Sequence, residues 1–287
     1  MNQTRDTKAP TLPSPIINTP KNNDKYPSKK IPISGSSVLK SPAKVWVYFH
    51  EGWWEPNSQF EINEDGTWGG ELDWKFAMPY GTNSIVARHE QGLEYSEDSA
   101  PVTFTVELPT VVITHPEQGG SVGQTAAFKG TGEPGAEVTV VMADDESKVL
   151  GTGTVYSTYE WQVGNGDVVL QPGKTCVKAN SRSSGETSPW TEPLCFFVKP
   201  FQPVIQSPPA GDVTSSIEVK GVGYQGASME VWLIGNPRVS LGKVDVDKDM
   251  GWKIPIQLPA GECEIEAIQT YQEAVSDPSP PRKFSVK

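Results

Sequence analysis

Apolar and polar residues alternate in short segments along most of the chain, and turns rich in glycine and proline separate these segments. A period of two places one face of a segment in a core and the other in solvent, which is typical of half-buried β-strands. No window of about eleven residues has helical periodicity, so we expect almost no helix. In the middle of the chain the pattern predicts strands at residues 111–114, 127–130, 137–142, 151–155, 159–163, 174–180 and 194–198.

The same pattern occurs three times, with a period of about ninety residues. Repeats of this length indicate whole domains, because solenoid repeats span only about 20 to 50 residues. Seven short strands in each repeat fit an immunoglobulin-like β-sandwich. The landmarks of the repeat are the glycines that open a Gly-x5-Ala segment, Gly81, Gly173 and Gly261, and the tryptophans that precede them, Trp68, Trp161 and Trp252.

The predicted fold class is therefore all-β, with three tandem immunoglobulin-like β-sandwich domains behind a disordered N-terminal leader. Prolines in the two joints, at residues 108–110 and 199–203, limit hinge freedom between the domains. The predicted parts are the leader at 1–12, an aromatic-rich and divergent first domain at 13–108, a second domain at 109–200 and a third at 201–287.

The chain has a formal net charge of −11, which argues against nucleic-acid or anionic-membrane binding by the domains. Residues 1–44 differ, with 8 Lys and Arg against 2 Asp and Glu, and we interpret the basic leader as a solvated, disordered arm, with a contact tail as the alternative. No apolar run reaches the roughly 18 residues of a membrane span, so we expect no membrane insertion. Residues 1–26 lack the apolar centre of a secretory signal peptide, and non-classical export and a cytoplasmic location both stay open.

Three segments of the second and third repeats resemble bacterial immunoglobulin-like domains, which form tandem arrays in surface, adhesive and toxin-associated proteins. These segments are residues 130–141 (GTGEPGAEVTVV), 244–252 (VDVDKDMGW) and 258–261 (LPAG). The first repeat departs from this pattern, with Ser41-Pro-Ala-Lys44 in place of the glycine-rich turn. The resemblance implies a spacer, display or recognition role without catalysis.

Motifs that look catalytic lie in turns, so we expect no enzyme and no cofactor. Residues 119–123 spell G-x-S-x-G, but a nucleophile elbow needs a following helix and a downstream histidine, and no histidine follows. Residues 130–135 and 221–226 spell G-x-G-x-x-G, yet strands follow both, whereas a dinucleotide fingerprint opens a helix. We interpret these two segments as turns that join the second and third strands of their repeats.

We expect no metal site. Residues 245–249 carry aspartate at alternate positions, which favours a polar hairpin rim, with a calcium site at a domain joint as the alternative. An EF-hand loop would need glycine and glutamate where the chain has Met250 and Ile256. The histidines are far apart in sequence, so solvated imidazoles are the expected state. They are His50, His89 and His115.

The Gly-x5-Ala register also sets the direction of the cysteines. Cys263 has the parity of the inward Ile265 and is expected to be a buried, unreactive thiol. Cys176 and Cys195 point outward on strands that are neighbours in this fold, so we predict a cross-strand disulfide, with free thiols as the alternative. A disulfide would indicate an oxidising compartment.

The first repeat holds five of the nine tryptophans. Strand parity turns three side chains of the segment 46–50 outward beside Arg88, and two further tryptophans follow in the adjoining loop. Solvent-facing aromatic rings stack on sugars or anchor protein partners. The predicted ligand-binding residues are Trp46, Tyr48, His50, Trp53, Trp54 and Arg88.

Three interpretations of this aromatic face stay open. The face recognises a protein or cell-surface partner, or it binds glycan as part of an accessory region of a larger enzyme, or the leader or second repeat buries it and the chain is a purely structural spacer. We favour a non-catalytic protein that is surface-associated, secreted or toxin-associated and that binds a protein or cell-surface partner through its first domain. A monomer is the default oligomeric state.

Overall fold

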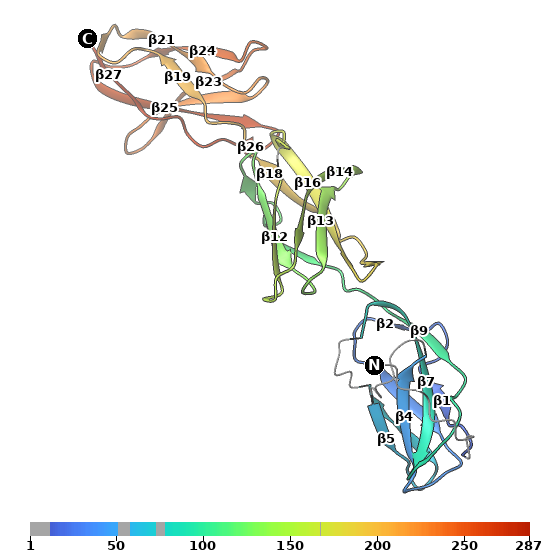
Figure 1. The fold of residues 1–287 in the computed structure, drawn as a ribbon. Coiled ribbons are helices and arrows are strands. Elements are labelled where there is room, and N and C mark those ends of the chain that lie inside the picture. The colour runs from blue at the N-terminus through green and yellow to red at the C-terminus, as the bar shows by residue number, and fades with distance from the viewer. Residues whose placement is uncertain (1–11, 51–57, 73–77, 167) are drawn as a thin grey trace. The chain divides into compact units, whose positions relative to one another are not determined.

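The computed structural model describes residues 12–50, 58–72, 78–166 and 168–287. Within these ranges the regular structure is made of β-strands, without a helix, and hence without a helix of the length and apolarity that would cross a bilayer. The strands build three tandem immunoglobulin-like β-sandwiches, which confirms the predicted fold class (Figure 1). The predicted leader lies outside the described residues, apart from Leu12.

The first sandwich packs a three-stranded sheet against a larger one. Its strands are Ile16–Thr19 (β1), Lys25–Tyr26 (β2), Pro32–Ser36 (β3), Lys44–Phe49 (β4), Ser58–Glu61 (β5), Thr67–Glu71 (β6), Gly81–Gln91 (β7), Glu94–Tyr95 (β8) and Val102–Val106 (β9). The smaller sheet has the order β1-β3-β6, and the larger has the order β2-β9-β7-β4-β5, with β8 paired to β7. Only β2 runs parallel to its partner, β9, among the described pairs of this sandwich.

The second sandwich repeats this topology. Its strands are Val112–His115 (β10), Ser121–Val122 (β11), Ala127–Thr131 (β12), Glu137–Met142 (β13), Asp145–Thr154 (β14), Glu160–Gly164 (β15), Gly173–Ser183 (β16), Glu186–Thr187 (β17) and Leu194–Val198 (β18). The smaller sheet has the order β10-β12-β15, and the larger has the order β11-β18-β16-β13-β14, with β17 paired to β16.

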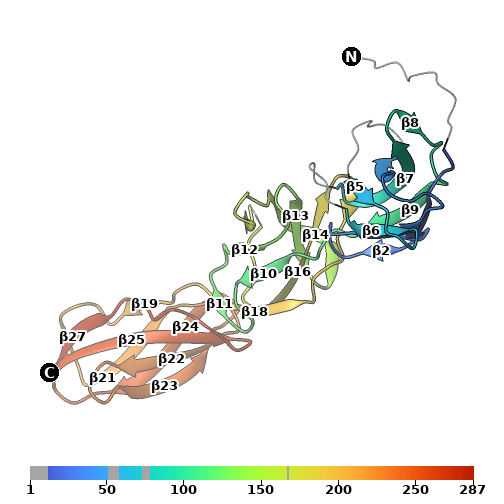
Figure 2. The same cartoon turned by 90° about the horizontal axis from the view of Figure 1, so that it is seen from below.

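The third sandwich has the same arrangement. Its strands are Val204–Ser207 (β19), Asp212–Val213 (β20), Ser216–Val222 (β21), Ser228–Leu233 (β22), Val239–Asp245 (β23), Gly251–Gln257 (β24), Gly261–Tyr271 (β25), Ala274–Val275 (β26) and Arg282–Val286 (β27). The smaller sheet has the order β19-β21-β24, and the larger has the order β20-β27-β25-β22-β23, with β26 paired to β25. Figure 2 shows β25, β22 and β23 of this sheet side by side.

A tryptophan packed on a glycine of the neighbouring strand completes each core. Trp161 on β15 pairs with Gly130 on β12 and is 1% exposed. A Cβ at Gly130 would lie 2.5 Å from Cζ2 of Trp161 and 1.8 Å from the carbonyl oxygen of Val112, so only glycine fits. The equivalent pairs are Gly35 with Trp68, and Gly221 with Trp252.

The observed strands differ from the predicted ones in two ways. The fourth strand of the second sandwich begins at Asp145, six residues before the predicted start, because it pairs directly with β13 through a tight hairpin. The prediction that residues 221–226 are a turn is wrong for Gly221, whereas Gly130 lies in the strand predicted at 127–130 and not in a turn. Both glycines lie within strands, and their role is the close approach of a tryptophan.

Candidate functional site

The outward side of β4 and β7 in the first sandwich carries three of the six predicted binding residues. On these antiparallel strands Trp46 lies opposite Arg88, and Tyr48 lies opposite Val86. Val47, between the two aromatic residues, is fully buried in the core. The side chains of Trp46, Tyr48 and Arg88 are half-buried, which places them on the outward side without full exposure.

Arg88 is held by a carboxylate and lies near a ring. Its Nε and Nη2 donate to Oδ1 of Asp98, at 3.0 and 2.6 Å. Its guanidinium carbon lies 5.8 Å from the centroid of the Tyr48 ring. Burial raises the pKa of Tyr48 to about 12, and the charge of Arg88 opposes that rise. The Tyr48 phenol is therefore neutral at physiological pH and can donate a hydrogen bond.

Trp46 has a polar group that the described chain leaves unsatisfied. Its indole N–H is buried and lacks a hydrogen-bond partner among the described residues. An unsatisfied buried donor costs about 1–3 kcal/mol, so an acceptor that reached it would gain that amount. His50 follows β4 and is exposed, while its backbone N–H donates to the Ser84 carbonyl at 2.8 Å. The other two predicted residues, Trp53 and Trp54, lie outside the described residues.

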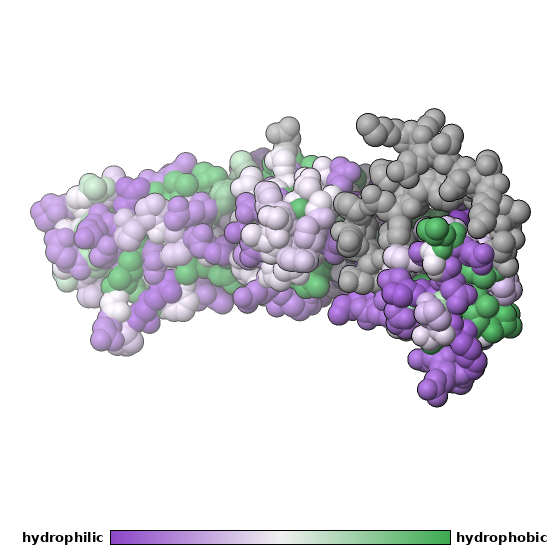
Figure 3. Space-filling model, turned by 60° about the horizontal axis from the view of Figure 1, so that its bottom comes forward, coloured by the Kyte–Doolittle hydropathy of each residue, from purple (hydrophilic) through white to green (hydrophobic). Residues whose placement is uncertain are grey.

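The equivalent positions of the other two sandwiches carry different side chains. Residues at the places of Trp46 and Tyr48 are Thr139 and Val141 in the second sandwich, and Glu230 and Trp232 in the third. At these two positions, therefore, an unsatisfied indole beside a tyrosine occurs in the first sandwich and not in the other two. The core residues Trp68 and Trp252 also have a buried N–H without a partner among the described residues. On the face that Figure 3 displays, the described apolar residues form small groups between hydrophilic ones.

Each sandwich nevertheless places a cation between an aromatic ring and a carboxylate on its larger sheet. The distances from cation to ring centroid are 5.8, 5.2 and 4.5 Å in chain order. The matching ion pairs are 2.6, 2.6 and 2.7 Å long. Such a recurring group covers the outer face of a sheet by cation–π contact and an ion pair. The groups are Arg88, Tyr48 and Asp98; Lys178, Trp190 and Glu146; and Arg238, Trp232 and Glu266.

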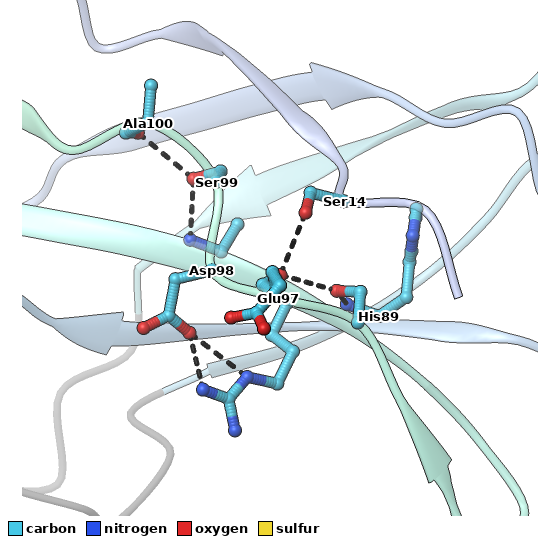
Figure 4. A network of polar contacts seen from close by, with 9 residues as sticks. Ser14, His89, Glu97, Asp98, Ser99 and Ala100 are labelled. Atoms are coloured by element: carbon cyan, nitrogen blue, oxygen red, sulfur yellow. Dashed lines mark hydrogen bonds and ion pairs between the residues drawn. The ribbon is translucent and has the colours of Figure 1, made fainter. Parts of the chain in front are cut away.

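The expectation of a solvated imidazole is wrong for His89. This residue lies on β7 with the inward parity of Ala87 and is 0% exposed. Its Nδ1 lies 2.6 Å from the Pro13 carbonyl oxygen, and its Nε2 is buried without a hydrogen-bond partner among the described residues. Burial lowers the pKa of His89, and the hydrogen bond to Pro13 opposes that shift in part. Figure 4 shows His89 beside Ser14 and the segment that follows β8.

Hydroxyl groups of the segment that follows β8, residues 96–99, hold that segment against β7. Ser96 and Ser99 accept hydrogen bonds from the backbone N–H groups of His89 and Ala87, at 2.9 and 3.0 Å, and Figure 4 shows the second of these. The sequence analysis missed these hydroxyl groups, although each of them lies at a fixed distance along the chain after the landmark glycine of its repeat. The corresponding pairs are Ser188 with Thr191, and Ser276 with Ser279.

Cys176 and Cys195 lie opposite each other on β16 and β18 and form a disulfide in the second sandwich. Cys263 is the free thiol and packs against the third core, as its parity predicts, but it is half-buried rather than fully enclosed. Burial raises the pKa of Cys263, which keeps it protonated and weakly nucleophilic.

The described residues do not group acidic, histidine or cysteine side chains into a set that could hold a metal ion. The aspartates of 245–249 form a hairpin rim, in which Oδ1 of Asp247 accepts from the backbone N–H groups of Asp249 and Gly251. These turn bonds give Asp247 a structural role in the hairpin.

Similarity to known proteins is found among solved structures. A scan against family models finds no match, and neither does a search of curated proteins. Among solved structures, an I-band fragment of titin aligns with 96% of this chain and 99% of its own, at 10% identity and a TM-score of 0.36. A tetra-tandem repeat from the extending region of a large adhesion protein aligns with 95% of this chain and 74% of its own, at 13% identity and a TM-score of 0.33.

A structure of a 1.5-MDa bacterial ice-binding adhesin aligns with 98% of this chain and 97% of its own, at 12% identity and a TM-score of 0.27. Likenesses this weak carry no argument about function. The assignment of three tandem immunoglobulin-like sandwiches rests on the strand order and register of the chain itself.

Proposed function

We propose that this chain is a non-catalytic spacer and binding protein of bacterial surface, secreted or toxin-associated type, and that its first sandwich recognises a protein or cell-surface partner. The observation that carries the proposal is the outward face of β4 and β7. There Trp46 has an unsatisfied buried N–H, and Tyr48 and Arg88 lie beside it. The second and third sandwiches lack this combination at the same positions.

The chemistry of this face fits a partner that brings a hydrogen-bond acceptor against aromatic surface. Tyrosine, tryptophan and arginine are the side chains that most often dominate binding energy at protein interfaces. Arg88 is already paired with Asp98, so it holds the Tyr48 ring in place and contributes a partly neutralised charge. We propose domain boundaries at residues 108/109 and 200/201, in the gaps between β9 and β10 and between β18 and β19.

A second candidate function is a structural spacer without a ligand, and the recurring cation, ring and carboxylate groups favour it. Because all three sandwiches contain such a group, Arg88 and Tyr48 serve the sheet surface in that case, as Arg238 and Trp232 do. The two functions differ in what they require of Trp46, which has no aromatic counterpart in the other sandwiches.

The experiment compares binding of the fluorescently labelled chain to a panel of intact bacterial and animal cells and to polysaccharide-coated beads. Trp46→Ala and Tyr48→Ala are expected to lower cell binding at least tenfold, which corresponds to about 1.4 kcal/mol per variant. Trp232→Ala is the matched control, because it removes a half-buried ring from the same position of the third sandwich. A wild-type chain that binds neither cells nor beads would favour the spacer, equal binding by all variants would exclude this face as the binding surface, and retention on the beads alone would favour a glycan ligand.

A further inference from the structure

One position of the repeat buries a polar side chain in every sandwich. It lies eight residues after the landmark glycine, on the longest strand of the larger sheet. The side chains there differ between the sandwiches, although all three are at most 1% exposed. They are His89 on β7, Ser181 on β16 and Gln269 on β25.

In the first sandwich this side chain fastens the segment that precedes β1. A carbonyl oxygen only accepts hydrogen bonds, so the contact of 2.6 Å with Pro13 makes Nδ1 of His89 the protonated nitrogen. Nε2 then carries a lone pair, buried without a donor among the described residues. We term the segment Leu12–Ser14 the strap. Two further hydrogen bonds hold it: the Leu12 N–H donates to the Tyr95 carbonyl at 3.4 Å, and Ser14 Oγ donates to the Glu97 carbonyl at 3.0 Å. Figure 4 shows the second of these bonds.

The third sandwich performs the same task with a group that does not titrate. Nε2 of Gln269 donates to the Phe201 carbonyl at 2.5 Å, three residues before β19, just as Pro13 lies three residues before β1. Oε1 of Gln269 accepts from the Tyr224 backbone N–H at 2.6 Å. Both ends of the amide are therefore satisfied. Ser181 in the second sandwich instead contacts Ser188.

We propose that His89 is an acid-sensitive latch, which holds the strap while its imidazole is neutral and releases the strap when Nε2 takes up a proton. A proton on Nε2 would place an N–H and a positive charge in a fully buried site without an acceptor among the described residues. Such a charge is strongly disfavoured in an apolar interior. Opening of the strap brings the ring into water and removes that cost.

The charged groups around His89 do not compensate its charge. Arg88 and Glu90 flank it on β7 and have the outward parity. The strap and β1 contain no titratable side chain. Burial is the larger influence on the pKa of His89 and the Pro13 carbonyl is the other; no charged side chain contributes. The titratable residues on the elements packed against His89 are Lys44, Tyr48, Arg88, Glu90, Glu94, Tyr95, Glu97 and Asp98.

The direction of the pH dependence follows from proton linkage. The pKa of His89 is lowered in the closed state, whereas an exposed imidazole titrates near pH 6.5. Below about pH 6.5 the open state binds more protons, so the ratio of closed to open strap falls by up to tenfold per pH unit. Above that pH the latch is at full strength. The fall ends at the pKa of the closed state.

The test is hydrogen–deuterium exchange of the full chain at about pH 7.5 and about pH 5, with each rate corrected for the intrinsic pH dependence of exchange. Amides from Leu12 to Thr19 report on the strap, and those from Phe201 to Ser207 report on the corresponding segment of the third sandwich. In the wild type we expect protection of the first segment to fall between the two pH values, by up to about 30-fold, and protection of the second to stay constant.

Two substitutions exchange the latches. His89→Gln installs the residue that the third sandwich uses, so strap protection should become independent of pH. Gln269→His should transfer the pH dependence to the segment that begins at Phe201. Strap protection in the wild type that is equal at both pH values, or an unchanged pH dependence in H89Q, would overturn the proposal.

If H89Q leaves the strap open at both pH values, an NMR titration of the wild-type imidazole gives the decision. Titration of His89 with the same midpoint as strap opening supports the latch. Titration of a ring whose strap amides stay protected overturns it.

Discussion

Gly130→Ala tests whether the glycine under each core tryptophan is required by contact distance. An added Cβ would lie 1.8 Å from the Val112 carbonyl oxygen and 2.5 Å from Cζ2 of Trp161. The carbonyl belongs to the neighbouring strand and the indole is 1% exposed, so neither can move freely. Overpacking of this kind costs about 3 kcal/mol, at the upper end of the usual range. Removal of glycine also stabilises by about 0.4–1 kcal/mol through the unfolded chain, which leaves a net loss of about 2 kcal/mol.

Hydrogen–deuterium exchange measures this loss within the full chain, because each sandwich supplies its own peptides. A loss of about 2 kcal/mol lowers protection of β12 and β15 by roughly 30-fold, while the first and third sandwiches act as internal references. Gly123→Ala is the matched control, since a Cβ there meets no atom within 4 Å and the residue has no positive φ. Protection of G130A within about twofold of the wild type, or an equal loss in G123A, would refute the contact-distance reasoning.

Three further outcomes are expected. Reduction of the Cys176–Cys195 disulfide, whose sequence separation is 19, should destabilise the second sandwich alone by about 3 kcal/mol; exchange measured with and without a phosphine reductant checks this, and a loss spread over all sandwiches would contradict it. Tyr48→Phe should remove an ultraviolet titration step near pH 12. Because burial raises the pKa of Tyr48, its contribution to stability is complete below the pKa of tyrosine in the unfolded chain, about 10, and declines above that pH. Met250→Gly should stabilise the third sandwich by up to about 1 kcal/mol, because Met250 has φ +64° where the first sandwich has Gly66. Hydrogen–deuterium exchange of β24 measures this change. Lower protection in the variant would show that the Met250 side chain stabilises the sandwich by more than the strained backbone costs.

Much of the fold could be predicted because alternation and repetition are local signals. The strands at 137–142 and 194–198 occur with the predicted bounds, and the outward parity of Trp46 and Tyr48 follows from the same period of two. The early start of β14 could not be predicted. Its first residues are polar and do not alternate, and they become a strand only because the hairpin aligns them with β13.

Close approaches in three dimensions lie beyond a pattern of this kind. The sequence places Gly130 where a predicted strand meets a glycine-rich turn. Nothing in its neighbours along the chain shows that the indole of Trp161, thirty-one residues later, occupies the space of a side chain at this position. His89 is a different case. Its parity matches that of the buried Ala87, so the period of two places it inside, and only the general expectation that an isolated histidine is solvated led to the wrong prediction.

The three sandwiches act as controls for one another, because the chain builds the same strand order three times from different sequences. Positions that keep one residue type, such as the glycine and tryptophan pairs and the serine or threonine hydroxyls that accept from β7, β16 and β25, are explained by the fold alone. Positions with the same burial but different chemistry need another explanation. His89, Ser181 and Gln269 share a buried position that holds three different polar side chains in the three sandwiches, so folding does not demand an imidazole there. The choice of the titratable residue in one sandwich is therefore the feature that the latch explains and the fold does not.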